Sequence, residues 1–242
     1  MSQLGGEGGI GAEDTPSGPM TLRLREGSVT PEGRRLGLTG GEVLLSVNGV
    51  AFSGKETALT ARLLMRRGKP LALTFAREGG NLLVLAGTTA LGRWEQVPAL
   101  PAPEGDAARI DPDGLRNYEV MRGPEGQYDL YAVEVPLLAV IAPPLWLFQM
   151  RVWAPGATLL VGMVAAAIVT PWLSLVVWLS AALWIRGAAL PLLRMDRQAR
   201  GLGFAGVVAA RSETEAHKLH QARSPGDRCI FCPEKETAAQ AA

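Results

Sequence analysis

The chain has 242 residues, a mass of 25.6 kDa and nearly balanced charge, with 24 basic and 23 acidic side chains. This balance argues against a nucleic-acid-binding protein, which normally carries a basic excess on one face, and two cysteines are too few for a disulfide framework. Charge is nearly absent from one long region: between Val133 and Leu193 only Glu134, Arg151 and Arg186 are charged. Long uncharged apolar stretches are typical of membrane helices, so we predict a membrane protein with soluble ends.

Residues 1–18 are rich in glycine and acidic residues. They lack the basic start and apolar centre of a secretory signal peptide, and they are too polar to build a packed core. We therefore predict a disordered leader that does not direct the N-terminus across a membrane.

Residues 19–91 have the pattern of a small α+β domain. Alternation of polar and apolar residues is typical of half-buried strands, and an Asn-Gly pair such as Asn48-Gly49 favours a tight hairpin turn. Apolar residues four and five positions apart predict a helix with one buried side. The predicted elements are strands at 21–25, 42–47, 70–77 and 81–85, and a helix at 55–67 with Leu59, Leu63 and Leu64 on its apolar side.

The segment from Gly27 to Gly49 carries a resemblance to a known family. It contains Leu36-Gly37-Leu38 and, a few residues later, the run GEVLLSVNG that ends at Gly49. This order is similar to the GL…GD-I-L-x-V-N-G segment of bacterial PDZ domains, with Glu42 in place of the usual Asp. The resemblance implies a PDZ-like fold over residues 20–85, about a quarter of the chain. An unrelated small α+β domain is the alternative.

The resemblance also implies where a peptide would bind. A PDZ-like module binds an extended peptide by adding it as a strand to a sheet edge. The implied contact residues are Leu22 and Leu24 on the first strand and Leu59 and Leu63 on the facing helix. Ordinary core packing is the alternative for all four.

Two segments connect this domain to the apolar region. Residues 92–108 are rich in proline and small residues, which favour an extended linker. Residues 109–132 hold all three tyrosines and two turn signals. We predict a juxtamembrane hairpin there, with strands at 118–122 and 128–132, lying just above the bilayer.

Two apolar segments follow, and together they predict an α-helical transmembrane hairpin. The first, 133–153, contains Pro143-Pro144, which must break or kink a helix, so it is predicted as a transmembrane or a re-entrant helix. The second, 156–186, exceeds the ~30 Å hydrocarbon core if it is helical throughout. Two helices divided at Pro171 would each be short for a span, so we predict one long transmembrane helix that tilts and kinks.

Four arginines just beyond the second apolar segment set the predicted topology. These are Arg186, Arg194, Arg197 and Arg200. The loop between the segments offers Arg151 alone, and basic residues favour the cytoplasmic side. We therefore expect a multi-pass protein of the bacterial inner membrane with both termini in the cytoplasm, and a disordered cytoplasmic tail at 187–242. Three spans, with the PDZ-like domain exported, is the alternative.

The tail holds all the histidines and cysteines of the chain, His217, His220, Cys229 and Cys232. Histidines three apart on a helix can share one face, and a Cys-x-x-Cys turn can present two thiolates to one metal. Tetrahedral zinc prefers such nitrogen and sulfur ligands, so a zinc site is one interpretation of the cluster. A redox-active thiol pair and a polar tail without function are the others.

No catalytic motif accompanies these features. The sequence has no phosphate-binding glycine loop with Lys-Ser/Thr, no HExxH and no GxSxG, so we assign no catalytic residue and expect a protein that is not an enzyme. We predict a membrane-anchored scaffold, adaptor or assembly protein whose partners are the lipid bilayer and other membrane proteins. The alternative is an accessory subunit of a larger respiratory or photosynthetic inner-membrane complex, with Gly162 and Ala166 packed on partner helices.

Overall fold

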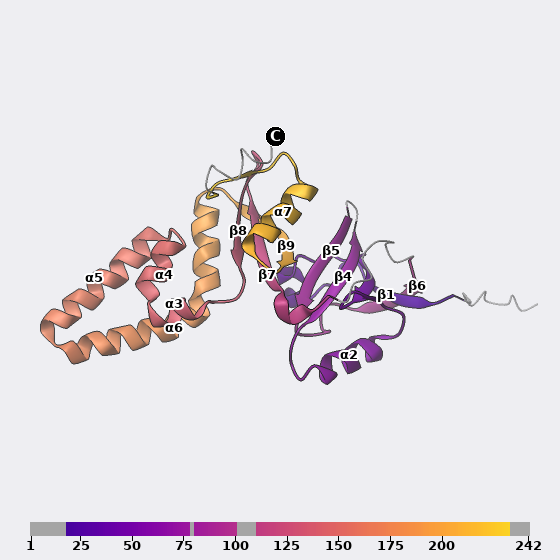
Figure 1. Ribbon diagram of the computed structural model, residues 1–242, viewed down its shortest axis with the longest axis horizontal. Helices are drawn as coiled ribbons and strands as arrows, with labels where there is room; N and C mark the ends of the chain where they lie inside the picture. Colours follow the sequence, from indigo (N-terminus) through magenta and orange to yellow (C-terminus); the bar gives the residue numbers. More distant parts are fainter. Residues whose placement is uncertain (1–17, 78–79, 101–109, 233–242) are drawn as a thin grey trace, which may run out of the picture.

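Two β-sheets and a protruding pair of apolar helices make up this computed structural model, which describes residues 18–77, 80–100 and 110–232 (Figure 1). Nearly all of the predicted leader, residues 1–17, lies outside the described residues, as do positions 233–242 of the predicted tail. The described chain mixes helices with two β-sheets, so the coarse prediction of a mixed α and β protein is confirmed.

The first sheet has six strands in the order β5-β4-β2-β1-β6, with β3 paired to β2. Its strands are antiparallel, and the four predicted strands and the predicted helix are all present. The elements are β1 Met20–Leu24, α1 Pro31–Arg35, β2 Val43–Val47, β3 Val50–Ala51, α2 Glu56–Met65, β4 Leu71–Arg77, β5 Gly80–Ala86 and β6 Trp94–Pro98.

Local turn chemistry fixes the middle of this sheet. Asn48 and Gly49 both have positive φ angles, 53° and 78°, which confirms the tight turn predicted between β2 and β3. Glu42 is buried, and its carboxylate accepts hydrogen bonds from the Thr39 amide and hydroxyl and from the Gly40 amide. The acidic residue at this position therefore ties the turn to the start of β2.

One side of α2 packs on the core of the first sheet. Leu59 is fully buried and Leu63 partly, as their spacing predicts, but Leu64 is 72% exposed. The prediction for Leu64 was wrong because a helix turns by about 100° per residue, which carries the residue after Leu63 off the buried stripe.

The predicted linker at 92–108 is also partly wrong. Strand β6 lies inside it and pairs with β1 from Met20↔Pro98 to Leu24↔Trp94. The Trp94 ring packs on the core and stacks on Phe75, with ring centroids 6.2 Å apart. Buried aromatic area outweighs the extended, unpacked tendency of the nearby prolines. Residues 101–109 of this segment lie outside the described residues.

The second sheet has the strand order β10-β8-β7-β9. The hairpin of β7 and β8 confirms the hairpin predicted at 109–132, whereas β9 and β10 come from the predicted disordered tail. The prediction of a tail at 187–242 was therefore wrong for its described part. The elements are η1 Pro112–Gly114, β7 Arg116–Arg122, β8 Gln127–Ala132, β9 Gly203–Ala210, α7 Glu213–Arg223 and β10 Arg228–Cys229.

The two faces of the second sheet pack against two different hydrophobic clusters. One face packs on α7 through Ala216, and its residues include Tyr118, Val120 and Tyr128. The other face carries Met121 and packs on the helices of the apolar region. The two sheets touch as well: the Asn117 side chain exchanges two hydrogen bonds with the Leu85 backbone, at 2.8 and 2.9 Å.

Four helices lie between β8 and β9, in place of the two predicted at 133–153 and 156–186. They are α3 Leu137–Ile141, α4 Pro143–Gln149, α5 Trp153–Val169 and α6 Pro171–Ala199. Pro143 and Pro144 occupy the first turn of α4, where missing amide donors cost little. At this break the Trp178 indole on α6 donates to the Ile141 carbonyl, at 2.9 Å.

The predicted single helix at 156–186 was wrong because the chain turns back at Thr170. A residue before proline avoids helical geometry, and Thr170 is extended, with φ −156° and ψ 143°. Its hydroxyl accepts a hydrogen bond from the Leu173 amide and so caps α6. Within the described ranges, α6 is the helix long and apolar enough to cross a membrane, and α5 is apolar but shorter.

Candidate metal and thiol site

Two elements after the apolar helices form the candidate site. Ser212 caps α7 by accepting the Glu215 amide. Strand β10 pairs in parallel with β8, which places Cys229 opposite Tyr128. The eight residues between His220 and Cys229 fold back as the sequence predicts, so the Cys-x-x-Cys turn faces α7.

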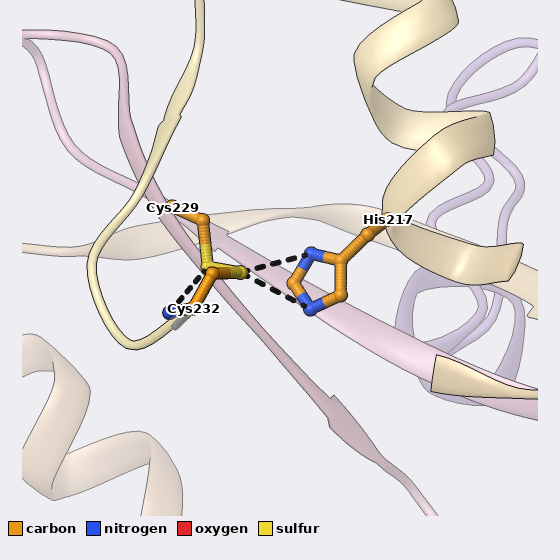
Figure 2. Close-up of side chains that lie close together, drawn as sticks. All are labelled: His217, Cys229 and Cys232. Carbon is orange, nitrogen blue, oxygen red and sulfur yellow. Dashed lines mark hydrogen bonds between the residues drawn. A yellow bond between two sulfur atoms is a disulfide. The ribbon is translucent and has the colours of Figure 1, made fainter. Parts of the chain in front are cut away.

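His217, Cys229 and Cys232 lie close together (Figure 2). One ligand atom from each residue falls within 4.8 Å of the other two. The Cys232 sulfur is 3.6 Å from Nε2 and 3.8 Å from Nδ1 of His217, and the Cys232 amide donates to the Cys229 sulfur at 3.1 Å. The two cysteines are joined by a disulfide.

His220 is not part of this cluster, contrary to the sequence prediction. It is 7% exposed, its Nε2 lies 3.0 Å from Asp227, and its ring centroid lies 4.3 Å from that of Tyr128. Asp227 also accepts from Arg122 at 2.7 Å. A three-residue step on a helix rotates the two rings about 60° apart, which is enough to direct one at the cysteines and the other into the sheet.

Electrostatics differ between the two histidines. Burial lowers the pKa of His220 below its ordinary value. The hydrogen bond to Asp227 has the opposite but smaller effect. His217 is ringed by polar groups: the Tyr128 hydroxyl is 3.1 Å from its Nδ1, and Glu213 is 3.9 Å from its Nε2. His217 in turn lowers the pKa of Glu213, against a smaller opposite effect of burial. A metal-ligating histidine usually donates its second ring N–H to a polar group, and the Tyr128 hydroxyl at Nδ1 would fill that place if Nε2 ligates a metal.

The chemistry of this cluster depends on its oxidation state. A tetrahedral zinc ion bonded at about 2.3 Å to sulfur and about 2.0 Å to nitrogen separates these two atoms by about 3.5 Å. The distance between Cys232 Sγ and His217 Nε2 is close to this value, at 3.6 Å. Thiolates are the ligands, however, and the disulfide removes both. The group can bind a metal only after reduction, and the two states exclude each other.

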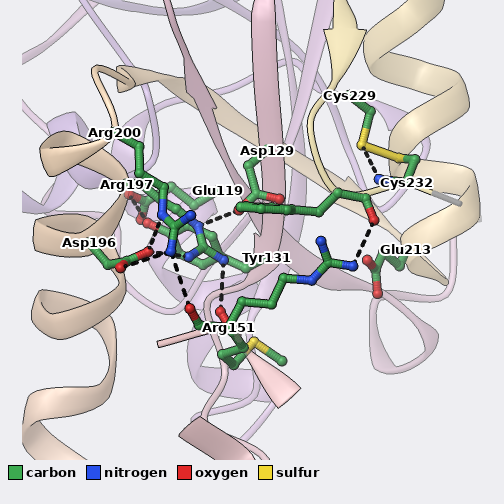
Figure 3. A network of polar contacts seen from close by, with 12 residues as sticks. Glu119, Asp129, Tyr131, Arg151, Asp196, Arg197, Arg200, Glu213, Cys229 and Cys232 are labelled. Atoms are coloured by element: carbon green, nitrogen blue, oxygen red, sulfur yellow. Dashed lines mark hydrogen bonds and ion pairs between the residues drawn. A yellow bond between two sulfur atoms is a disulfide. The ribbon is translucent and has the colours of Figure 1, made fainter. Parts of the chain in front are cut away.

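Phe231, inside the Cys-x-x-Cys turn, connects this site to the base of the apolar helices. The guanidinium groups of Arg151, Arg197 and Arg200 lie 4.6 to 5.4 Å from its ring centroid. Figure 3 shows Arg197 and Arg200 beside Asp196 in the network at this base. Arg200 also donates to the Arg151 carbonyl, at 3.2 Å. These contacts fix the turn between α4 and α5 against the Cys-x-x-Cys turn.

Sequence reasoning missed the buried ion pairs that dock α6 on the second sheet. Glu119 is fully buried and accepts two bonds from Arg194, both at 2.7 Å, and one from the Tyr131 hydroxyl at 2.9 Å. Arg197 donates to Asp129 and Asp196, both at 2.5 Å. The available signal was the spacing of Arg194, Arg197 and Arg200, which places them near one face of a helix. From the sequence, these arginines were interpreted only as charges that flank a membrane segment.

The four residues predicted to contact a peptide do not line an open groove. Leu22, Leu24 and Leu59 belong to the buried core, Leu63 packs against it, and β1 is already paired on both edges, with β2 and β6. A separate cleft of ≈ 530 Å³ lies between the C-terminal part of α2 and the turn between β2 and β3. Its lining residues are Val47, Asn48, Val50, Arg62, Met65, Arg66, Leu71, Ile110, Asp111 and Pro112.

Comparison with known proteins gives no match: no family model, no curated protein and no solved structure is similar enough to this chain to be recognised as related.

Proposed function

We propose that this protein is a membrane-anchored, non-enzymatic scaffold, adaptor or assembly protein. A folded body of two sheets, the first of them PDZ-like, holds partner proteins at the membrane, and the helices between β8 and β9 are the anchor. The membrane is the bacterial inner membrane and the body is cytoplasmic.

One observation carries the anchoring role. Between Arg151 and Arg186 the chain has no charged residue. Helix α5 and the first half of α6 expose many of their apolar side chains. A helix that is apolar all round is stable when it is buried in protein or in lipid. Removing apolar surface from water stabilises a protein by about 25 cal/mol per Å². Insertion into a bilayer would remove the apolar surface of these helices from water.

Membrane fractionation tests the anchor. The protein should sediment with membranes after alkaline carbonate washing, and the Val161→Lys/Leu179→Lys variant should be released, because each buried charge costs about 2.5–3.5 kcal/mol. Leu64→Lys, on the exposed side of α2, is the matched control and should stay bound. Release of the unaltered protein by carbonate contradicts the proposal.

An accessory subunit of a larger membrane complex is the second candidate. Open space surrounds the position where a Cβ at Gly162 would lie, at least among the described residues, so a partner helix has room to approach there, whereas Ala166 is already buried. Mild-detergent purification at native expression, with mass spectrometry, separates the two. A fixed stoichiometric set of membrane subunits supports the accessory subunit, and a varied substoichiometric set supports the adaptor.

We also propose that the reduced cluster of His217, Cys229 and Cys232 binds zinc. The spacing of the ligand atoms supports this assignment, and so does the Tyr128 hydroxyl, which lies 3.1 Å from Nδ1 of His217 and leaves Nε2 for the metal. Zinc would supply a structural tie between α7 and the Cys-x-x-Cys turn.

Elemental analysis of protein purified under reducing conditions tests the zinc site. About one zinc per chain is expected, with loss in His217→Ala and Cys229→Ser. His220→Ala is the matched control and should keep its zinc, because His220 bonds Asp227 instead. Absence of zinc from fully reduced protein contradicts the site and leaves the cysteines as a redox pair.

A further inference from the structure

The apolar hairpin formed by residues 153–185 is the most unusual surface of the molecule (Figure 1). We call α5 and the first half of α6 the outer hairpin. Every residue from Pro171 to Ser180 is exposed or half-buried. Its large exposed apolar residues are Trp153, Leu160, Val161, Val164, Ile168, Val169, Trp172, Leu173, Leu175, Val176, Leu179, Leu183 and Trp184.

Both ends of the outer hairpin return to one sheet. The chain leaves β8 at Ala132, passes through the helices and re-enters the same sheet at Gly203, where β9 pairs with β7. The second half of α6 is held on that sheet by Arg194 and Arg197. The hairpin therefore enters and leaves a membrane on the same face.

The helix α6 is long enough to span a membrane, but only part of it is available to do so. Its C-terminal part bends and runs along the second sheet (Figure 1), and the buried residues Ala189, Leu193 and Arg197 in that part recur every four positions. Pro191 lies in this stretch and removes a backbone donor, which favours the bend. At 1.5 Å per residue, the 17-residue α5 and the free part of α6 each reach only about 25 Å or less.

The tip of the hairpin is apolar. Ile168, Val169 and Trp172 are 81%, 70% and 70% exposed. The hydroxyl of Thr170 accepts the Leu173 amide, and the Thr170 amide donates to the Ala166 carbonyl, so the hydroxyl and the amide of Thr170 are both paired within the turn. A tip that crossed the bilayer would have to reach water about 30 Å away, and polar or charged residues normally mark such a crossing.

The base of the hairpin has the features of a membrane interface. Trp153 and Trp184 lie at the start of α5 and near the end of the free part of α6, next to Arg151 and Arg186. Exposed apolar residues of α3 and α4 lie beside α6, where the Trp178 indole donates to the Ile141 carbonyl. They are Leu137, Leu138, Ile141 and Leu145. Tryptophan next to arginine favours the headgroup region, whereas Trp172 at the tip has no charged residue near it in the sequence. Short apolar helices can lie in the plane of the headgroups.

We propose that the outer hairpin enters the bilayer from the face on which both sheets lie and ends within the hydrocarbon, without reaching water on the opposite side. The partner is the lipid bilayer itself. This inference rests on the proposed membrane anchor and specifies its geometry: one re-entrant insertion in place of two spans.

Cysteine labelling in sealed membrane vesicles tests the inference. In the full chain with Cys229→Ser and Cys232→Ser, single cysteines are placed at the tip, as Val169→Cys or Ile168→Cys, and on the body, as Glu125→Cys in the β7–β8 turn. The two tip variants keep Thr170 and its cap, and either one serves if the other fails to fold. A membrane-impermeant maleimide is added to each face in turn, and again after detergent.

The body cysteine should be labelled from one face. The tip cysteines should be labelled from neither face, with at least a tenfold gain in detergent. Tip labelling from the face opposite to the body contradicts the inference and establishes a transmembrane hairpin. Tip labelling from the body's own face shows a hairpin that is not inserted. If carbonate releases the protein, the anchor itself fails, which is a separate result.

Discussion

The two sheets of this protein are assembled in different ways. All strands of the first sheet lie between Met20 and Pro98, and most pair with a neighbour in the chain. The second sheet pairs β7 with β9 across all four apolar helices. The first sheet depends on turns and apolar spacing, whereas the second depends on partners brought from far along the chain, including buried charges. Pairing strands that are far apart in the chain requires closing a long loop, which costs conformational entropy before the contacts between the strands can form.

The largest effect should follow from breaking the buried charges of the second sheet. Arg194→Ala leaves the fully buried Glu119 without its partner and should lower the free energy of unfolding by about 3–5 kcal/mol. The double variant Glu119→Leu/Arg194→Leu should recover much of this loss, because two apolar residues need no partner. Urea unfolding of the full chain in detergent measures both. Equal losses in the single and double variants would show that the ion pair is not the cause.

A matched pair on α2 tests the first sheet. Leu59→Ala should cost about 2–5 kcal/mol because the side chain is fully buried. Leu64→Ala should change stability by less than about 0.5 kcal/mol because the side chain is exposed. The same unfolding experiment measures both variants. Similar costs would restore the sequence prediction that the two leucines share one buried side.

The smallest effect is a pH dependence confined to the second sheet. The first sheet has no histidine, and burial lowers the pKa of His220 in the second. Below about pH 6.5 the unfolded chain binds a proton that the folded His220 resists, so stability should fall from that pH down to the folded-state pKa. The groups facing His220 are Asp227, Tyr128 and, through Asp227, Arg122.

Urea midpoints at pH 7.5 and pH 5.5 check this dependence. The unaltered protein should lose stability at the lower pH, and His220→Phe should lose less. If both proteins lose the same stability between pH 7.5 and pH 5.5, the pH dependence belongs to another group.

Sequence reasoning recovered the first sheet because its signals are local. Asn48-Gly49 predicts its own turn, and Leu59 with Leu63 predicts the buried side of α2. It missed β9 because Gly203–Ala210 consists mainly of glycine, alanine and valine, without a clear polar–apolar alternation. This segment becomes a strand because it pairs with β7. It also missed β6, because Trp94 is stabilised by packing on Phe75, a residue 19 positions earlier in the chain.

The candidate site was predicted in part for the same reason. The spacing of Cys229 and Cys232 is a local signal, and the fold brings His217 to them. His220 left the cluster because Asp227, a residue on the intervening loop, binds it instead. The turn at Thr170 could have been predicted from Pro171, but the requirement for a full membrane span was given more weight than the residue before a proline.

Hydrogen–deuterium exchange on the full chain in membranes or detergent tests most directly whether the second sheet closes across the apolar helices. The amides of Gly203–Ala210 should be protected as strongly as those of Arg116–Arg122, because the two strands share one set of hydrogen bonds. Exchange of 203–232 at the rate of an unstructured chain, with β7 and β8 still protected, would contradict the account and restore the tail that the sequence alone predicts.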